Sequence, residues 1–125
     1  MQIRLFNRQD DKELRALVQS INESQGTVMD LDGKDNDLRN VEGTYFGHDG
    51  LFLVADDEGT IVAFCGARIG TESSNVAGET LEITRLWAKD GLDKTIVDRL
   101  ISIVSNHAWQ LDFEKVSVSD ELVAI

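Results

Sequence analysis

Two apolar, β-rich runs joined by a short acidic turn are the feature that most restricts how this chain can fold. Residues 51–69 read LFLVADDEGTIVAFCGARI, and the segment DDEG at 56–59 separates the two runs. Glycine beside acidic residues supplies the backbone conformations of a tight hairpin turn, while runs rich in Val, Ile, Phe and Leu favour strands. The sequence therefore predicts an antiparallel hairpin here, made of its two clearest strands.

Hydrophobic patterning places further elements on both sides of this hairpin. An amphipathic helix is predicted at 7–22 because its apolar residues recur at helical spacing, and Asn7 or Asp10 can cap its start. A second helix, with a broad apolar face beginning at Leu92, is predicted up to about residue 104. Strands are expected at 1–6, 80–88 and 114–118, with a polar loop and a short helix between 23 and 46. The predicted order is β-α-(α)-β-β-β-α-β.

Size and composition indicate one folded domain spanning residues 1–125. Hydrophobic residues make up 42% of the 125, enough to form a core without disulfides or metals. Cys65 is the only cysteine, so no intrachain disulfide can form, and its apolar surroundings favour a buried structural thiol. The sequence contains neither a signal-peptide core nor an apolar run of about 20 residues, so we expect a cytoplasmic protein with no membrane partner.

Acidic residues outnumber basic ones, and this imbalance limits the class of partner. The net charge of −11 disfavours nucleic acid and anionic membranes and favours a cationic or neutral partner, for which a small molecule is possible. An acidic DNA mimic is a minor alternative that only the charge supports. The stretch DLDGKDND at 30–37 does not fit a calcium loop, because counting from Asp30 puts Lys34 at the fifth position and Val41 at the twelfth. We therefore expect a solvated acidic loop and no metal.

From Ile3 to about Asp120, the order of elements and several phrases resemble the GNAT superfamily of N-acetyltransferases. One phrase is DLRNVEGTYFGHDGLFLVADDEGTIVAFCGARI, in which an acidic helix and a glycine turn precede two strands; the other is LEITRLWA, a strand that leads into a helix. The resemblance implies an α+β (α/β) fold with a mixed, mostly antiparallel sheet and helices on both faces. Because members usually continue with another helix and two strands, it also implies a fold truncated after the fifth strand.

The resemblance implies where acetyl-CoA or another acyl-CoA would bind. The backbone of Leu86, Trp87 and Ala88 would pair with the pantetheine arm, and Lys94 and Thr95 stand near the glycines of the loop that wraps the pyrophosphate. In the family this loop reads R-x-x-G-x-G, whereas here it reads GLDKTIV.

Two aspartates lie where the helix after this loop should begin. The carboxylates of Asp90 and Asp93 can accept the free N–H groups of its first turn, so the chain can fill its own anion site. We therefore predict a degenerate acyl-CoA site.

Glu82 is the candidate catalytic residue, since the resemblance aligns it with a glutamate that acts as general base on the substrate amine. Strict alternation along 80–88 would put Glu82 on one face with Leu86 and Ala88, and Leu81 on the other with Arg85. A structural, salt-bridged glutamate is the competing interpretation. The family's general acid is often a tyrosine, but the only tyrosine here, Tyr45, is not at the matching place.

Two hypotheses about function follow. In the first, transferase activity is weak or lost, and the cleft or a dimer surface is used for binding. In the second, the protein is an active acyl-CoA-dependent N-acetyltransferase with Glu82 as general base. Since an uncovered sheet edge tends to acquire a partner, we also predict a homodimer formed through the segment from about Phe113 to Ile125.

Overall fold

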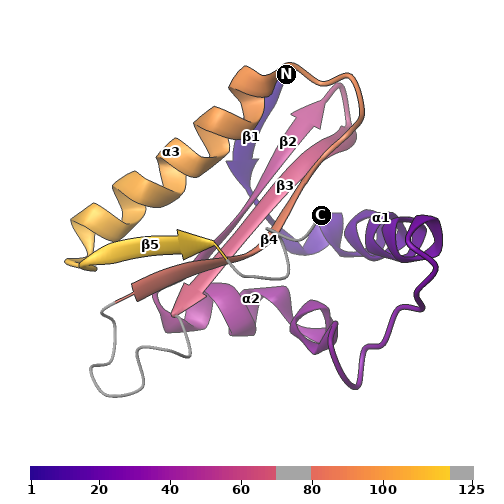
Figure 1. Cartoon of the computed structure of the whole chain (residues 1–125), viewed down its shortest axis with the longest axis horizontal. Helices are drawn as coiled ribbons and strands as arrows, with labels where there is room; N and C mark the ends of the chain where they lie inside the picture. The colour runs from indigo at the N-terminus through magenta and orange to yellow at the C-terminus, as the bar shows by residue number, and fades with distance from the viewer. Residues whose placement is uncertain (70–79, 119–125) are drawn as a thin grey trace.

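The computed structural model describes residues 1–69 and 80–118 and contains a single five-stranded sheet (Figure 1). The strands follow one another across the sheet in the order β1-β2-β3-β4-β5, and only the last pair, β4 with β5, is parallel. The predicted mixed, mostly antiparallel sheet is thus confirmed. The strands are β1 (Gln2–Leu5), β2 (Leu51–Asp57), β3 (Thr60–Ile69), β4 (Thr80–Ala88) and β5 (Lys115–Val118).

Helices cover both faces of the sheet, as predicted. Figure 1 shows α3 on one side of the strands and α1 with α2 on the other. The α-helices are α1 (Asp11–Ser24), α2 (Val41–Tyr45) and α3 (Lys94–Gln110), and the 3-10 helices are η1 (Arg8–Asp10), η2 (Asn36–Arg39) and η3 (Phe46–His48). Leu92 lies before α3 rather than on its apolar face, because Asp93 caps the helix. None of the helices within the described ranges is long and apolar enough to cross a membrane.

The sheet separates two hydrophobic clusters. Leu100, Val104 and Ala108 of α3 pack on one face, in a cluster that includes buried Cys65 and Phe113. The other cluster contains buried residues of α1, α2 and the opposite sheet face, namely Leu14, Val18, Val41, Tyr45, Phe52 and Phe64 among others. We call these two sides of the sheet the α3 face and the α1/α2 face.

The predicted hairpin is present as β2 and β3. Its two-residue loop consists of Glu58 and Gly59, whose φ angles of 51° and 90° are both positive. Positive φ at both positions is the geometry of the tight turns that match strand twist, which explains why an acidic residue followed by glycine stands here. Asp56 adds a hydrogen bond from the Gly59 N–H to its carboxylate at 2.7 Å.

A β-bulge in β4 overturns the predicted alternation of its side chains. Gly66 of β3 pairs with Arg85, but the next residue of β3, Ala67, pairs with Ile83, so Thr84 is an extra residue in β4. An extra residue reverses the side-chain parity along a strand. Before the bulge, the odd-numbered Leu81 and Ile83 lie on the α3 face. After the bulge, the even-numbered Leu86 and Ala88 lie on that face.

Two of the predicted segments lie outside the described residues. These are the polar connection at 71–79 and the tail from residue 119 onward. The part of the C-terminal segment that the structure describes packs within the same chain. Phe113 is buried in the core, and β5 pairs with β4.

Candidate functional site

The outer edge of β4 is open where the acyl-CoA arm is expected. β5 pairs with β4 only from Thr80 to Ile83, so within the described ranges no strand follows Thr84–Ala88 on that side. The stretch contains Leu86, Trp87 and Ala88, whose other edge is hydrogen-bonded to β3. Backbone groups on an open strand edge can pair with an extended ligand. This edge and the neighbouring start of α3 form the candidate acyl-CoA site.

The first turn of α3 is capped by the chain's own carboxylate. Asp93 is the N-cap residue, and its Oδ1 accepts a hydrogen bond from the Thr95 N–H at 3.0 Å. The bond to the Thr95 backbone N–H lowers the pKa of Asp93, so the group is anionic at neutral pH. Lys94 and Thr95 form the exposed start of the helix. The predicted capping is confirmed for Asp93, whereas Asp90 lies in the turn before it and makes no hydrogen bond to the helix.

Glu82 lies on the α1/α2 face, not on the face with Leu86 and Ala88 that alternation predicted. It is the cross-strand partner of Arg68, whose guanidinium lies 5.9 Å from the centre of the Tyr45 ring. Directly paired residues share a face, so Glu82 is half-buried on the same side as that ring. No hydrogen bond or ion pair joins Glu82 to another residue of the described chain.

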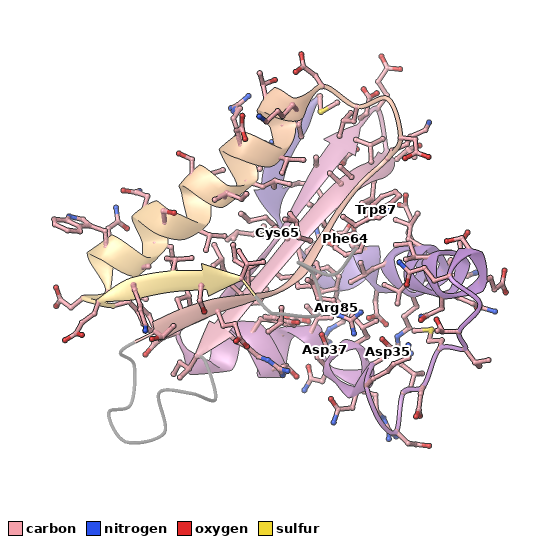
Figure 2. The ribbon with its side chains drawn as sticks, in the orientation of Figure 1. Asp35, Asp37, Phe64, Cys65, Arg85 and Trp87 are labelled. Atoms are coloured by element: carbon pink, nitrogen blue, oxygen red, sulfur yellow. The ribbon has the colours of Figure 1, made fainter. Side chains whose placement is uncertain are left out.

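Arg85, three residues along β4, is the centre of a buried polar network. Its Nε donates to Asp37 Oδ2 at 2.9 Å, and its Nη2 donates to Asp37 Oδ1 at 2.7 Å and to Asp35 Oδ1 at 2.9 Å. Figure 2 shows the three side chains gathered between β4 and the chain leading to α2. The aspartate side chains are 2% and 4% exposed. The expectation of a solvated acidic loop is therefore wrong for these two residues.

Tyr45 extends the network from α2 to the bulge. Its hydroxyl donates to Asp37 Oδ2 at 2.5 Å and lies 3.1 Å from the Thr84 hydroxyl oxygen. Burial and the nearby Asp37 carboxylate raise the pKa of Tyr45 well above its usual value, so the phenol stays protonated. A group in this state donates a hydrogen bond to a fixed partner and is a poor proton donor to a ligand.

The aspartates of the network are anionic despite their burial. Burial pushes the pKa of Asp37 upward, but hydrogen bonds and charge from Arg85 outweigh it, and the pKa is lowered overall. The same balance lowers the pKa of Asp35, where Lys34 also donates to Oδ2 at 2.8 Å. The network is thus an ion cluster that ties the 30–40 loop to β4. No group of side chains suited to a metal ion occurs in the described part of the chain.

Aromatic rings line the α1/α2 face beside this network. Trp87 stacks on Phe64 with ring centres 5.5 Å apart, and Phe64 stacks on Phe52 at 5.9 Å. Figure 2 shows Trp87 and Phe64 close together, next to the strands. Trp87 therefore contributes a packed ring on one side, while its backbone remains at the open edge of β4. Trp109, in contrast, is 80% exposed and is not part of the core.

A cavity of about 610 Å³ opens on the same side of the sheet, between α2 and the end of β3. It is lined by Asn40, Gly43, Thr44, Arg68 and Ile69. Sequence reasoning did not find Arg68 or the Asp35–Asp37–Arg85 cluster. The available signal was the pair of aspartates spaced by one residue in the 30–37 loop, which places two carboxylates within reach of one cation.

Comparison with solved structures finds GNAT-family acetyltransferases. One from Staphylococcus aureus superposes with a TM-score of 0.78 at 19% identity, covering 98% of this chain and 77% of that one. A Clostridium acetobutylicum protein described as a predicted acetyltransferase, solved with acetyl-CoA, gives 0.72 at 14% identity, with coverages of 94% and 79%. An aminoglycoside N-acetyltransferase in complex with CoA gives 0.63 at 11% identity, with coverages of 94% and 78%.

No protein-family model matches the sequence, and no curated protein matches it. The structural matches cover nearly the whole chain, but their low identities bear on architecture and not on activity. The five-stranded, mostly antiparallel sheet and its helices account for the superposition on such a structure with a TM-score of 0.78. On this basis, the chain has the fold of the GNAT superfamily of N-acetyltransferases.

Proposed function

We propose that this chain is a GNAT-fold protein with a degenerate acyl-CoA site, in which transferase activity is weak or lost and the cleft or a dimer surface serves binding. The observation that carries the proposal is the hydrogen bond from the Thr95 N–H to the Asp93 carboxylate at 3.0 Å. A helix N-terminus binds a pyrophosphate through free N–H groups and a positive dipole. Here a carboxylate occupies one of those donors and opposes an approaching anion.

The surroundings of Asp93 support the same conclusion. Thr95 and Ile96 are β-branched, whereas a phosphate that approaches the backbone closely is best accommodated by glycine. Lys89 and Lys94 are exposed and offer positive charge, but on a chain of net charge −11. Long-range repulsion therefore acts against a polyanionic cofactor.

The test is thermal unfolding with and without millimolar acetyl-CoA, using CoA and ATP to separate acyl, adenine and phosphate contacts. A ligand at one hundred times its dissociation constant stabilises a protein by about 2.7 kcal/mol, a visible shift in a domain of this size. We expect no shift for the wild type. A clear wild-type shift with acetyl-CoA but not with ATP would overturn the proposal.

Variants of Asp93 show whether this residue closes the site. Asp93→Gly frees the Thr95 N–H and removes the charge, so we expect it to gain stabilisation by CoA. Asp93→Asn removes the charge but can keep the cap, and should gain less. Asp90→Asn is the matched control, because it removes the same charge from a residue that does not bond to the helix. Equal gains in the control would show that only net charge matters.

The second candidate is an active acyl-CoA-dependent N-acetyltransferase with Glu82 as general base. Two observations favour it: Glu82 is half-buried with no partner in the described chain, and the edge of β4 at Leu86–Ala88 is open. A free carboxylate can accept a proton from a substrate amine if it lies within hydrogen-bond reach. An amine screen that detects free CoA thiol, repeated with Glu82→Gln, tests this activity. Turnover that Glu82→Gln abolishes would establish it.

We also propose a homodimer formed through the segment that starts near Phe113. β5 is the last strand of the sheet, so its outer edge has unpaired backbone donors and acceptors within the described residues. Sedimentation equilibrium over a range of protein concentrations measures the mass directly. A mass that stays monomeric at the highest concentration would contradict the dimer.

A further inference from the structure

The cavity between α2 and β3 contains an arginine with no carboxylate in direct contact, although its charge contributes to lowering the pKa of the buried Asp37. Arg68 is half-buried and lies over the Tyr45 ring, yet no ion pair or hydrogen bond joins its guanidinium to the residues of the described ranges. Each of the other described arginines that are half-buried, Arg4, Arg15 and Arg85, has a carboxylate partner. On a chain with 23 acidic residues, a guanidinium at a cavity wall that forms no direct ion pair with the described residues is a candidate anion contact.

Two polar side chains complete the donor set. Asn40 Oδ1 accepts from the Gly43 N–H at 3.0 Å, which leaves the Asn40 Nδ2 donors without an acceptor among the described residues. Thr44 contributes a hydroxyl that likewise has no partner there. A guanidinium, an amide N–H and a hydroxyl at one cavity match the needs of a carboxylate. Ile69 adds an apolar wall.

Glu82 places the opposite charge beside this donor set. It is the direct cross-strand partner of Arg68, on the same face of the sheet, and neither residue is paired to the other by an ion pair. Side chains in this relation have Cβ atoms about 5 Å apart. Arg68 and Glu82 are neighbours that do not form an ion pair with each other. They can therefore bind the carboxylate and the ammonium group of a small zwitterion.

We propose that this cavity binds a small aliphatic α-amino acid, with its carboxylate on Arg68, Asn40 and Thr44 and its ammonium group toward Glu82. The cavity volume of about 610 Å³ is within the range of small-molecule sites. A zwitterion also satisfies the electrostatics of the whole chain, since a simple carboxylate is repelled by the net charge of −11. This inference rests on the proposed binding role and names its ligand class.

The test is a titration of ¹⁵N-labelled full-length protein with L-leucine, followed by amide chemical shifts. Two probes each remove one charge: N-acetyl-L-leucine lacks the ammonium group, and L-leucinamide lacks the carboxylate. The pH is held below about 7.7, the α-amino pKa of a peptide and the limit for L-leucinamide, so that the ammonium groups of L-leucinamide and of the more basic free L-leucine are both protonated. We expect saturable shifts at Gly43, Thr44 and Ile69 with L-leucine, and binding at least about tenfold weaker for either probe.

Variants assign the two charges. Arg68→Gln should abolish the L-leucine shifts, and Arg68→Lys should retain part of the binding because it keeps the charge but not the planar fork. Glu82→Gln should reduce L-leucine binding to the level of N-acetyl-L-leucine. Arg99→Gln is the matched control, since Arg99 is an exposed residue of α3, on the other side of the sheet, and should bind like the wild type.

Two results would overturn the inference: no saturable shifts with L-leucine, or unchanged binding in a well-folded Arg68→Gln variant. Equal affinity for L-leucine and N-acetyl-L-leucine would also overturn it, because Glu82 would then contribute nothing. The titration contains no CoA. Absence of L-leucine binding would therefore not contradict the proposed degenerate acyl-CoA site. A thermal shift of the wild type with acetyl-CoA would in turn not contradict the proposed amino-acid site.

Discussion

Arg85 and Asp37 form a bidentate ion pair across 48 residues of sequence, with nitrogen–oxygen distances of 2.9 and 2.7 Å. The pair joins the bulged part of β4 to the loop before α2. Because the Asp37 side chain is 4% exposed and that of Arg85 is 17% exposed, water can replace little of the pairing if one partner is removed. The position of the 30–40 loop over the sheet is therefore linked to the charge state of this pair.

Removing the carboxylate of Asp37 should destabilise the protein strongly. Asp37→Asn leaves the buried Arg85 with only Asp35 as a charged partner, and breaking a buried pair in this way costs about 3–5 kcal/mol. Urea unfolding gives the free energy directly. Asp32→Asn is the control, because the Asp32–Arg39 pair is 88% and 61% exposed and should change stability by less than about 1 kcal/mol. Similar losses in both variants would contradict a buried role for Asp37.

Acid should unfold the protein through carboxylates whose pKa is lowered by folding. Arg4 lowers the pKa of Asp10, and the Arg85 network lowers the pKa of Asp35 and Asp37. A lowered pKa gives stability that is present above the unfolded value, about 3.9, and is lost as pH falls through the folded value. We expect the free energy of unfolding to fall below about pH 4, less steeply in Asp37→Asn. Constant stability down to about pH 2 would contradict this.

Alkaline conditions should destabilise the protein through Cys65. Burial raises the pKa of this thiol to about 12, whereas an unfolded cysteine titrates near about 8.5. The group therefore contributes stability that is full below the unfolded pKa and is lost as pH rises, by about 1.4 kcal/mol per pH unit. Cys65→Ala should remove this slope between about pH 8.5 and pH 10, above which Tyr45 adds its own. Urea unfolding under reducing conditions measures both slopes, and identical slopes would refute the assignment.

Gly66 should not tolerate a side chain. A Cβ at this position would lie 2.6 Å from Phe52 Cδ2 and 3.0 Å from Tyr45 Cε1, so Gly66→Ala forces two buried rings to move. Overpacking of this kind costs about 1–3 kcal/mol. Gly47→Ala is the control because its nearest neighbour would be 4.0 Å away, and it should be close to neutral. The difference in melting temperature between the two variants is the measurement.

The elements of this fold were predictable because each has a local signal. The turn at Glu58 and Gly59 and the apolar spacing of α1 depend on neighbours a few residues apart, and β4 was predicted with its observed bounds, Thr80–Ala88. The Asp93 cap was also predictable, since its partner is two residues away.

The polar network and the faces of β4 were not predictable from local patterns. Asp37 and Arg85 are 48 residues apart, and nothing near either residue indicates that they meet. The extra residue at Thr84 leaves no mark in the composition of β4, so strict alternation placed Glu82 on the wrong side. These two predictions failed because the Asp37–Arg85 pair and the face of Glu82 depend on contacts between segments that are distant in the sequence.

The extra residue at Thr84 also determines how this strand responds to insertions and deletions. Deleting Thr84 would restore simple alternation and would leave Leu81, Ile83, Leu86 and Ala88 all on the α3 face, because these four residues would then stand at every second position. An insertion or deletion elsewhere in the strand would instead reverse the faces of the residues on one side of it. A single-codon deletion at this position would therefore be better tolerated than one elsewhere in β4, its direct loss being the contact between the Thr84 and Tyr45 hydroxyls. Over evolutionary time, the length of β4 could change at the bulge without moving its apolar side chains off the α3 face.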